Sequence, residues 1–234
     1  MTSVILFDFF GTLVDAPTQL ASVPFPESHR FLNSLGVELT YEEYFARWES
    51  TSARFDRAAR EDRLEYSMTA LAKSFLGECL AEETAARVSD SYVDVFLAEW
   101  DAAVQEIDGI DGTIEALARS FRLAIVSNTN DPRLVPSRLE RLGILEYFDV
   151  VLLSVEHGRR KPHPLIYRSA LEALAASPDE AVFVGDSFEA DYLGPRAVGI
   201  DAWLIDPAQS YEVDPARRIS SVLELPGRLG ANGA

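Results

Sequence analysis

Five short apolar runs, rich in Val and Ile, constrain the fold of this chain more than any other feature. They cover residues 4–9, 123–126, 150–153, 181–184 and 202–205. Each run ends in polar residues or glycine. Runs of this length and composition are typical of strands that are buried on both faces of a parallel sheet. We therefore expect a parallel sheet with these five segments as its strands.

Helical patterns lie between the later runs, at residues 113–120, 132–142, 164–175 and 189–198. Proline is tolerated in the first turn of a helix, and the patterns at 132–142 and 164–175 both begin with one. Gly143 follows 132–142, as is common just beyond a helix end. Strands that alternate with helices in this way predict an open, doubly wound α/β sheet.

A long helical stretch interrupts this alternation after the first strand. Its apolar residues recur at helical spacing, first at Tyr41, Tyr44, Phe45, Trp48 and Phe55, and later at Leu71, Phe75, Val88, Tyr92, Val95, Phe96 and Trp100. Residues 15–26 hold three prolines and indicate a linker. We predict an α-helical domain at residues 17–107, inserted into an α/β core formed by residues 1–16 and 108–234. The tail at 227–234 is expected to be frayed.

The charge balance excludes several classes of partner. The formal net charge is −17, and so negative a chain repels nucleic-acid phosphates and anionic membranes. No apolar run approaches the length of a membrane span. Cys79 is the single cysteine, so no intrachain disulfide can form. We expect a soluble cytoplasmic protein without nucleic-acid or membrane partners, as a monomer or a homodimer.

Polar residues that can carry chemistry follow the ends of the predicted strands. They include Asp8, Ser127, Lys161, Asp186 and Asp191. Ligands of open α/β sheets bind outside the carboxyl ends of the strands, so we expect these side chains to share one site. Three neighbouring carboxylates raise one another's pKa, and a divalent cation would remove that cost. Oxygen ligands and a phosphate-bearing substrate favour Mg²⁺.

The same residues suggest a reaction. A carboxylate such as Asp8 can act as a nucleophile and form an aspartyl-phosphate. Lys161 would add a fixed positive charge. Ser127 and the backbone amides near Thr12 would hold the equatorial oxygens of the transferring group.

Four motifs appear in order along the chain: FDFFGTL, SNT, KP and VGDSFEAD. Together they resemble the motifs of the haloacid dehalogenase superfamily of hydrolases. The resemblance covers essentially the whole chain and implies a Rossmann-like core. It also implies a helical cap inserted between the first two strands, where this chain carries its helical stretch.

The resemblance implies roles for individual residues. Asp8 would be the nucleophile and a metal ligand, and the carbonyl of Phe10 and the carboxylate of Asp186 would complete the protein's ligands to Mg²⁺. Asp191 would support the metal or Lys161, and Lys161 would steady Asp8 and the phosphoryl oxygens. The catalytic set is Asp8, Ser127 and Lys161; the metal set is Asp8, Phe10, Asp186 and Asp191; the substrate-binding set is Phe10, Gly11, Thr12 and Asn128.

One position departs from the phosphatases of that superfamily. They usually carry a second aspartate two residues after the nucleophile, as the general acid, whereas this chain has Phe10. General acid–base help is worth roughly 10²–10⁴-fold. The dehalogenase branch has an aromatic residue there but lacks the metal-binding aspartate that this chain keeps as Asp186.

The retained metal site favours a magnesium-dependent phosphatase that acts on a small phosphorylated metabolite. Two alternatives remain open. One is a metal-independent 2-haloacid dehalogenase with Asp8 as its nucleophile. The other is a catalytically weakened protein that binds a phosphate ligand.

Overall fold

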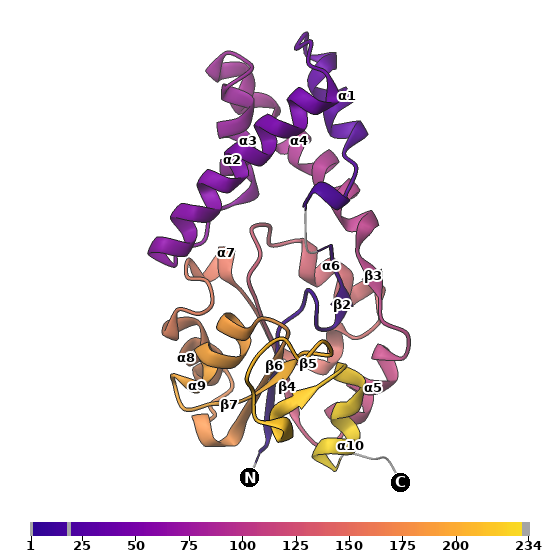
Figure 1. Ribbon diagram of the computed structural model, residues 1–234, viewed down its shortest axis with the longest axis vertical. Coiled ribbons are helices and arrows are strands. Elements are labelled where there is room, and N and C mark those ends of the chain that lie inside the picture. The colour runs from indigo at the N-terminus through magenta and orange to yellow at the C-terminus, as the bar shows by residue number, and fades with distance from the viewer. Residues whose placement is uncertain (1, 18–19, 231–234) are drawn as a thin grey trace. The chain divides into compact units, whose positions relative to one another are not determined.

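The computed structural model describes residues 2–17 and 20–230. The chain forms two compact units (Figure 1). The first comprises Met1–Asp15 and Glu106–Ala234 and is called the core unit below. The second, Ala16–Gln105, is called the helical unit.

A six-stranded parallel sheet forms the centre of the core unit, in the order β5-β4-β1-β6-β7-β8. The strands are β1 (Val4–Phe7), β4 (Arg122–Ser127), β5 (Phe148–Leu153), β6 (Ala181–Gly185), β7 (Asp201–Ile205) and β8 (Arg218–Ile219). All five predicted strands are present. A separate two-stranded sheet pairs β2 (Val14–Asp15) with β3 (Gln105–Glu106).

Helices cover both faces of the large sheet. They are α5 (Ile110–Ala118), α6 (Leu134–Arg141), α7 (Ser154–His157), α8 (Pro164–Ala173), α9 (Gly194–Arg196) and α10 (Leu225–Leu229). Alternate strand residues such as Leu6 and Phe183 form one buried cluster with α8, while α5 and α10 lie on the other side of the sheet (Figure 1). Every residue of β1 is buried. The predicted doubly wound α/β fold is confirmed.

Two local predictions about the core unit were inaccurate, and one short strand was not predicted. Residues 189–198 do not form one α-helix: a π-helix spans Phe188–Leu193, and α9 follows it with Pro195 in its first turn. The two-residue strand β8 was not predicted. Residues 227–229 are not frayed but belong to α10, which is anchored by the buried Leu225; residues 231–234 lie outside the described part.

The helical unit contains α1 (Pro26–Ser34), α2 (Tyr41–Asp62), α3 (Met68–Gly77) and α4 (Glu82–Ala103). Trp48 packs edge-to-face on Phe75 and also contacts Tyr92 and Phe96. The hydroxyls of Tyr44 and Tyr92 are 2.8 Å apart, and burial raises the pKa of both. Of the aromatic residues predicted at helical spacing, Tyr44, Trp48, Phe75, Tyr92 and Phe96 therefore form the unit's own core, whereas Tyr41 is exposed.

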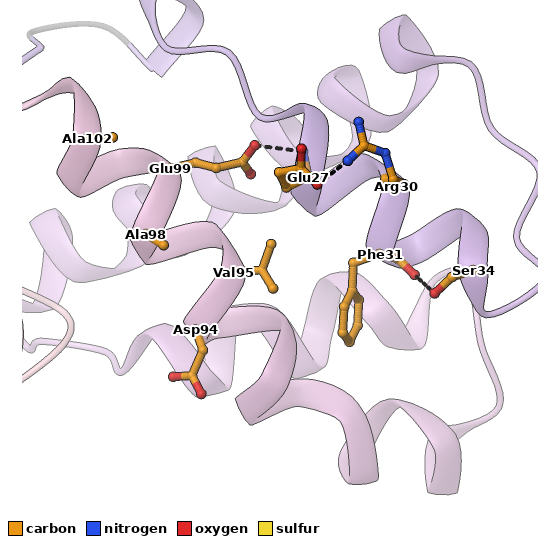
Figure 2. Close-up of a pocket in the computed structure, with 9 residues that line it drawn as sticks. All are labelled: Glu27, Arg30, Phe31, Ser34, Asp94, Val95, Ala98, Glu99 and Ala102. Atoms are coloured by element: carbon orange, nitrogen blue, oxygen red, sulfur yellow. Dashed lines mark hydrogen bonds and ion pairs between the residues drawn. The ribbon is translucent and has the colours of Figure 1, made fainter.

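The start of α1 depends on a side chain from α4. Phe25 precedes α1 and provides no side-chain cap. Instead, Glu99 accepts hydrogen bonds from the backbone N–H groups of Glu27 (2.7 Å) and Ser28 (2.9 Å), and from the Ser28 hydroxyl (2.5 Å). Figure 2 shows this contact beside a groove that Phe31 and Val95 help to line. A carboxylate at a helix N-terminus also complements the helix dipole.

No helix among the described residues combines the length and the apolar character needed to cross a membrane.

Glu99→Ala should destabilise α1 by about 1–2 kcal/mol, since three hydrogen bonds to one carboxylate are lost. Hydrogen exchange of the α1 amides is the measurement, and their protection should fall. Glu49→Ala removes an exposed glutamate of α2 and is the matched control. Equal protection of α1 in both variants would contradict the capping role.

Candidate active site

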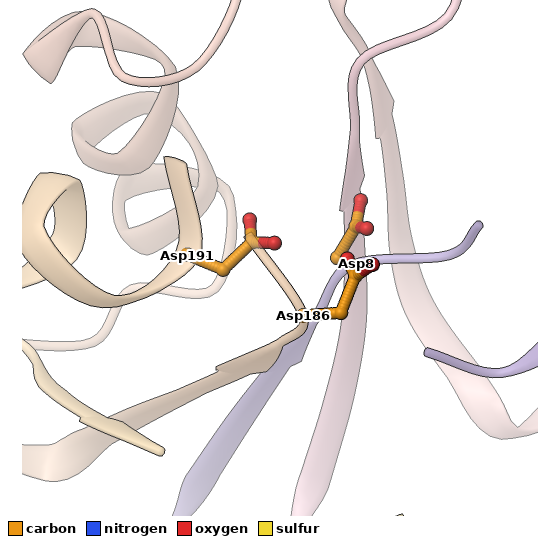
Figure 3. Close-up of side chains that lie close together, drawn as sticks. All are labelled: Asp8, Asp186 and Asp191. Carbon is orange, nitrogen blue, oxygen red and sulfur yellow. The ribbon is translucent and has the colours of Figure 1, made fainter. Parts of the chain in front are cut away.

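The carboxyl ends of three neighbouring strands bring the predicted acidic residues together. Phe7, the last residue of β1, pairs with Ile125 of β4 and Val184 of β6, so the three strands end almost level. Asp8 follows β1, and Asp186 follows β6. Asp191 comes from the π-helix, and Figure 3 shows it turned toward the other two. Carboxylate oxygens of the three residues lie within 4.8 Å of one another.

A tight turn follows Asp8 and lets Asp186 approach. The carbonyl of Phe9 accepts hydrogen bonds from the N–H groups of Leu13 and Thr12, and the Gly11 N–H donates to Val14. Gly11 has φ +79°, a left-handed conformation that favours glycine. A side chain at position 11 would also collide with the Asp186 carboxylate. The turn therefore requires glycine for two independent reasons.

This turn uses two of the backbone amides near Thr12. We expected backbone amides near Thr12 to bind the oxygens of a transferring group. The N–H groups of Gly11 and Thr12 instead donate within the turn, at 2.8 Å to Val14 and 3.3 Å to Phe9. They serve the loop's own conformation.

Lys161 supplies the positive charge of the site. It is 3% exposed, and its Nζ donates to Asp8 Oδ1 and Asp191 Oδ1, both at 2.7 Å. Burial alone would lower the pKa of Lys161, but the charges of Asp191 and Asp8 outweigh it and raise the pKa. The amine therefore stays protonated over the physiological range.

Asp191 is fully engaged by the protein. One carboxylate oxygen bonds to Lys161, and the other accepts from the Ser187 backbone N–H at 2.9 Å. A side chain in place of Gly185 would collide with it. Burial raises the pKa of Asp191, and the Lys161 ammonium opposes that shift. Of the two predicted roles, direct metal ligation and support of Lys161, the geometry matches the second.

Lys161 donates hydrogen bonds to Asp8 and Asp191, and Asp186 is the third carboxylate of the cluster. Burial, with the nearby charge of Asp8, raises the pKa of Asp186 to about 6. The cluster thus holds three carboxylates around one ammonium group. Oxygen donors with surplus negative charge fit a hard divalent cation, and the predicted ligands Asp8 and Asp186 lie where such an ion could bind.

Two hydroxyls near the strand ends lack partners. Ser127 and Thr12 are buried, and their side-chain oxygens make no hydrogen bond within the described part of the chain. A buried hydroxyl without a partner costs free energy, so such groups in a site call for a ligand. Both residues belong to the predicted set.

Asn128, which we predicted to bind substrate, contacts Lys161 through its side chain. Its Nδ2 donates to the Lys161 carbonyl at 3.0 Å, and its Oδ1 accepts from the Lys161 N–H at 2.7 Å. Both polar ends of the side chain are therefore bonded to the backbone of residue 161. No signal in the sequence indicated this contact.

Ser154 was also missed from the sequence. At the start of α7, its hydroxyl accepts from the Thr129 N–H at 2.9 Å and donates to the Thr129 carbonyl at 3.1 Å. It ties the loop after β4 to the end of β5.

Phe10 occupies the position two residues after Asp8. Its half-buried ring packs edge-to-face on Phe9, with centroids 5.0 Å apart. An aromatic ring can neither donate nor accept the proton that a carboxylic acid would transfer there.

A haloacid dehalogenase-like hydrolase family model matches residues 2–199. The fold, the order of the motifs and this match together show that the chain belongs to that family of hydrolases.

Similar curated proteins align with different fractions of the chain. The human haloacid dehalogenase-like hydrolase domain-containing protein 3 is 40% identical over 117 residues, which is 50% of this chain and 45% of that protein. The chain thus spans about half the length of this and similar relatives. The phosphoglycolate phosphatase of Aquifex aeolicus is 29% identical over 83% of this chain and 80% of its own length.

Two solved structures match nearly the whole chain. A HAD phosphatase from Thermococcus onnurineus is 27% identical, with TM-score 0.70 and 99% coverage of both chains. A 2-haloacid dehalogenase from Pseudomonas syringae is 24% identical, with TM-score 0.77 over 98% of this chain and 99% of its own. The second likeness concerns the fold alone.

Asp186→Asn should stabilise the metal-free protein at pH 8, because it removes a partly desolvated charge repelled by Asp8. The pKa of Asp186 lies near 6 in the folded state and is ordinarily 3.8. The gain should therefore be largest above pH 6 and shrink as the pH falls from 6 to 3.8. Thermal unfolding in chelator across this range is the measurement.

Glu189→Gln, which neutralises an exposed carboxylate three positions away, is the matched control and should show no such gain. A loss of stability in Asp186→Asn at pH 8 would contradict the charge surplus.

Proposed function

We propose that this protein is a magnesium-dependent phosphatase that hydrolyses a small phosphorylated metabolite through an aspartyl-phosphate on Asp8. The observation that carries the proposal is the cluster of Asp8, Asp186 and Asp191 around Lys161. Support also comes from two similar proteins that are named as phosphatases and align over most of the chain.

Each residue has a defined task in this proposal. A carboxylate oxygen of Asp8 attacks phosphorus, and the bond from phosphorus to the leaving oxygen breaks. Lys161 neutralises charge on Asp8 and on the phosphoryl oxygens. The unpartnered hydroxyls of Ser127 and Thr12 donate hydrogen bonds to those oxygens. Water then cleaves the phosphorus–oxygen bond to Asp8 and regenerates the carboxylate.

Asp8, the Phe10 carbonyl and Asp186 would hold Mg²⁺. When bound, the ion supplies charge neutralisation between the nucleophile and the phosphoryl group. Asp191 keeps Lys161 in place with one carboxylate oxygen, and the other accepts from the Ser187 N–H.

The helical segment 17–107 is proposed to act as a cap for the core formed by 1–16 and 108–234. A cap excludes bulk water during the reaction and selects the substrate.

Phe10 favours a second candidate, a metal-independent 2-haloacid dehalogenase. A halide leaves carbon without protonation, so a site without a general acid suits that reaction. In this case Asp8 would displace the halide from carbon and form an ester. Halide release that is insensitive to chelator would identify it.

With Mg²⁺ present, the protein should release phosphate from an aryl phosphate. Chelator or Asp8→Asn should reduce release to the level of the blank, because the first removes the ion and the second the nucleophile. Asp111→Asn alters an exposed aspartate of α5 and should leave the rate unchanged. Release that persists in Asp8→Asn would contradict the proposal.

Wild-type activity should be strongly biased toward good leaving groups, since Phe10 cannot protonate an alkoxide. Phe10→Asp should raise kcat for alkyl phosphates by up to roughly 10²–10⁴-fold and change aryl phosphates little. The measurement is the ratio of kcat/KM for an alkyl and an aryl phosphate. Phe10→Asn, which is polar but transfers no proton, is the control; equal gains in both variants would contradict the argument.

A further inference from the structure

The loop after β4 and the segment that carries Lys161 meet through one side chain. Asn128 bonds to both the N–H and the carbonyl of Lys161, at 2.7 and 3.0 Å. The two residues lie 33 positions apart in the chain. This pair of bonds between one side-chain amide and one residue's backbone is called the Asn128 clamp below.

The clamp acts on the part of Lys161 that its ion pairs leave unrestrained. Asp8 and Asp191 hold Nζ, at the far end of a flexible side chain with four methylene groups. The clamp fixes the backbone from which that side chain extends. A side-chain amide is suited to this task because it offers a donor and an acceptor together.

The clamp also joins two groups of the proposed site. Ser127, with its unpartnered buried hydroxyl, directly precedes Asn128. The next residue, Thr129, is held by Ser154 through two hydrogen bonds. The loop that directly follows Ser127 is thus held by hydrogen bonds to Ser154 and to Lys161.

We propose that Asn128 is a positioning residue, which sets the location of the Lys161 ammonium relative to Ser127 by clamping the Lys161 backbone. It acts through Lys161 and does not touch the substrate. The inference rests on the proposed function insofar as Lys161 and Ser127 hold the transferring group. A displacement of about 1 Å in such a site can cost 10²-fold in rate.

The chain provides a direct assay, because Lys73 and Lys161 are its only lysines. Lys73 is exposed and serves as an internal reference for acetylation by N-hydroxysuccinimide acetate, followed by mass spectrometry. In Asn128→Ala, acetylation of Lys161 relative to Lys73 should rise severalfold. Asn130→Ala, in the same loop, is the matched control and should match the wild type.

Asn128→Asp provides a second variant of nearly equal size. It keeps an acceptor for the Lys161 N–H but places a second acceptor against the Lys161 carbonyl, so a rise in Lys161 acetylation is again expected. Lys161 protection that is unchanged in both variants overturns the proposal. The assay needs no turnover, so this result is independent of the reaction.

A double-mutant cycle tests the consequence for catalysis. Asn128→Ala should lower kcat by about 10- to 100-fold with a smaller effect on KM. In a Lys161→Ala background the same substitution should have little further effect, since the residue through which it acts is gone. Multiplicative losses would overturn the proposal, because Asn128 would then act independently of Lys161.

The two experiments separate failure of the proposal from failure of the proposed function. Absence of Asp8-dependent turnover in the wild type would refute the proposed function. The acetylation assay would still decide whether Asn128 holds Lys161 in place.

Discussion

The buried ammonium group of Lys161 is the interaction on which the rest of the site depends. A buried charged group has lost its hydration and needs partners of opposite charge. For Lys161 these partners are the carboxylates of Asp8 and Asp191, each 2.7 Å from Nζ. The dependence is mutual, because the two carboxylates would otherwise repel each other in the same space. Small residues make the arrangement possible: Gly185 leaves room for Asp191, as Gly11 does for Asp186.

The balance of charge explains why the cluster is suited to chemistry as well as to folding. One ammonium cannot neutralise three carboxylates, and burial together with the charge of Asp8 raises the pKa of both Asp186 and Asp191. The surplus sits at the carboxyl edge of the sheet, beside two buried hydroxyls without partners, so the fold leaves both negative charge and hydrogen-bond donors available at one place.

The sequence predicts the sheet and the carboxylate cluster for a shared reason. Buried parallel strands leave contiguous apolar runs, and residues that follow such runs must meet at one edge. The bonds of Asn128 to Lys161, and the role of Ser154, could not be found this way, because their partners are backbone groups at distant positions in the chain. The π-helix at Phe188–Leu193 and the strand β8 were not predicted for a different reason. They contain six and two residues, which are too few to show a hydrophobic period.

The presence of Phe10 allows two contributions to catalysis to be considered apart: electrostatic stabilisation and acid–base catalysis. The electrostatic one depends on Lys161, the buried hydroxyls and the carboxylates, and the structure retains all of these. The acid–base one depends on a single proton donor beside the leaving oxygen, and an aromatic ring cannot supply it. Electrostatic stabilisation acts on the transferring group whichever leaving group it was attached to. Protonation matters only for a leaving group that is a strong base. Under the proposed function, a site built in this way would therefore discriminate among substrates by the basicity of the leaving group as well as by its shape.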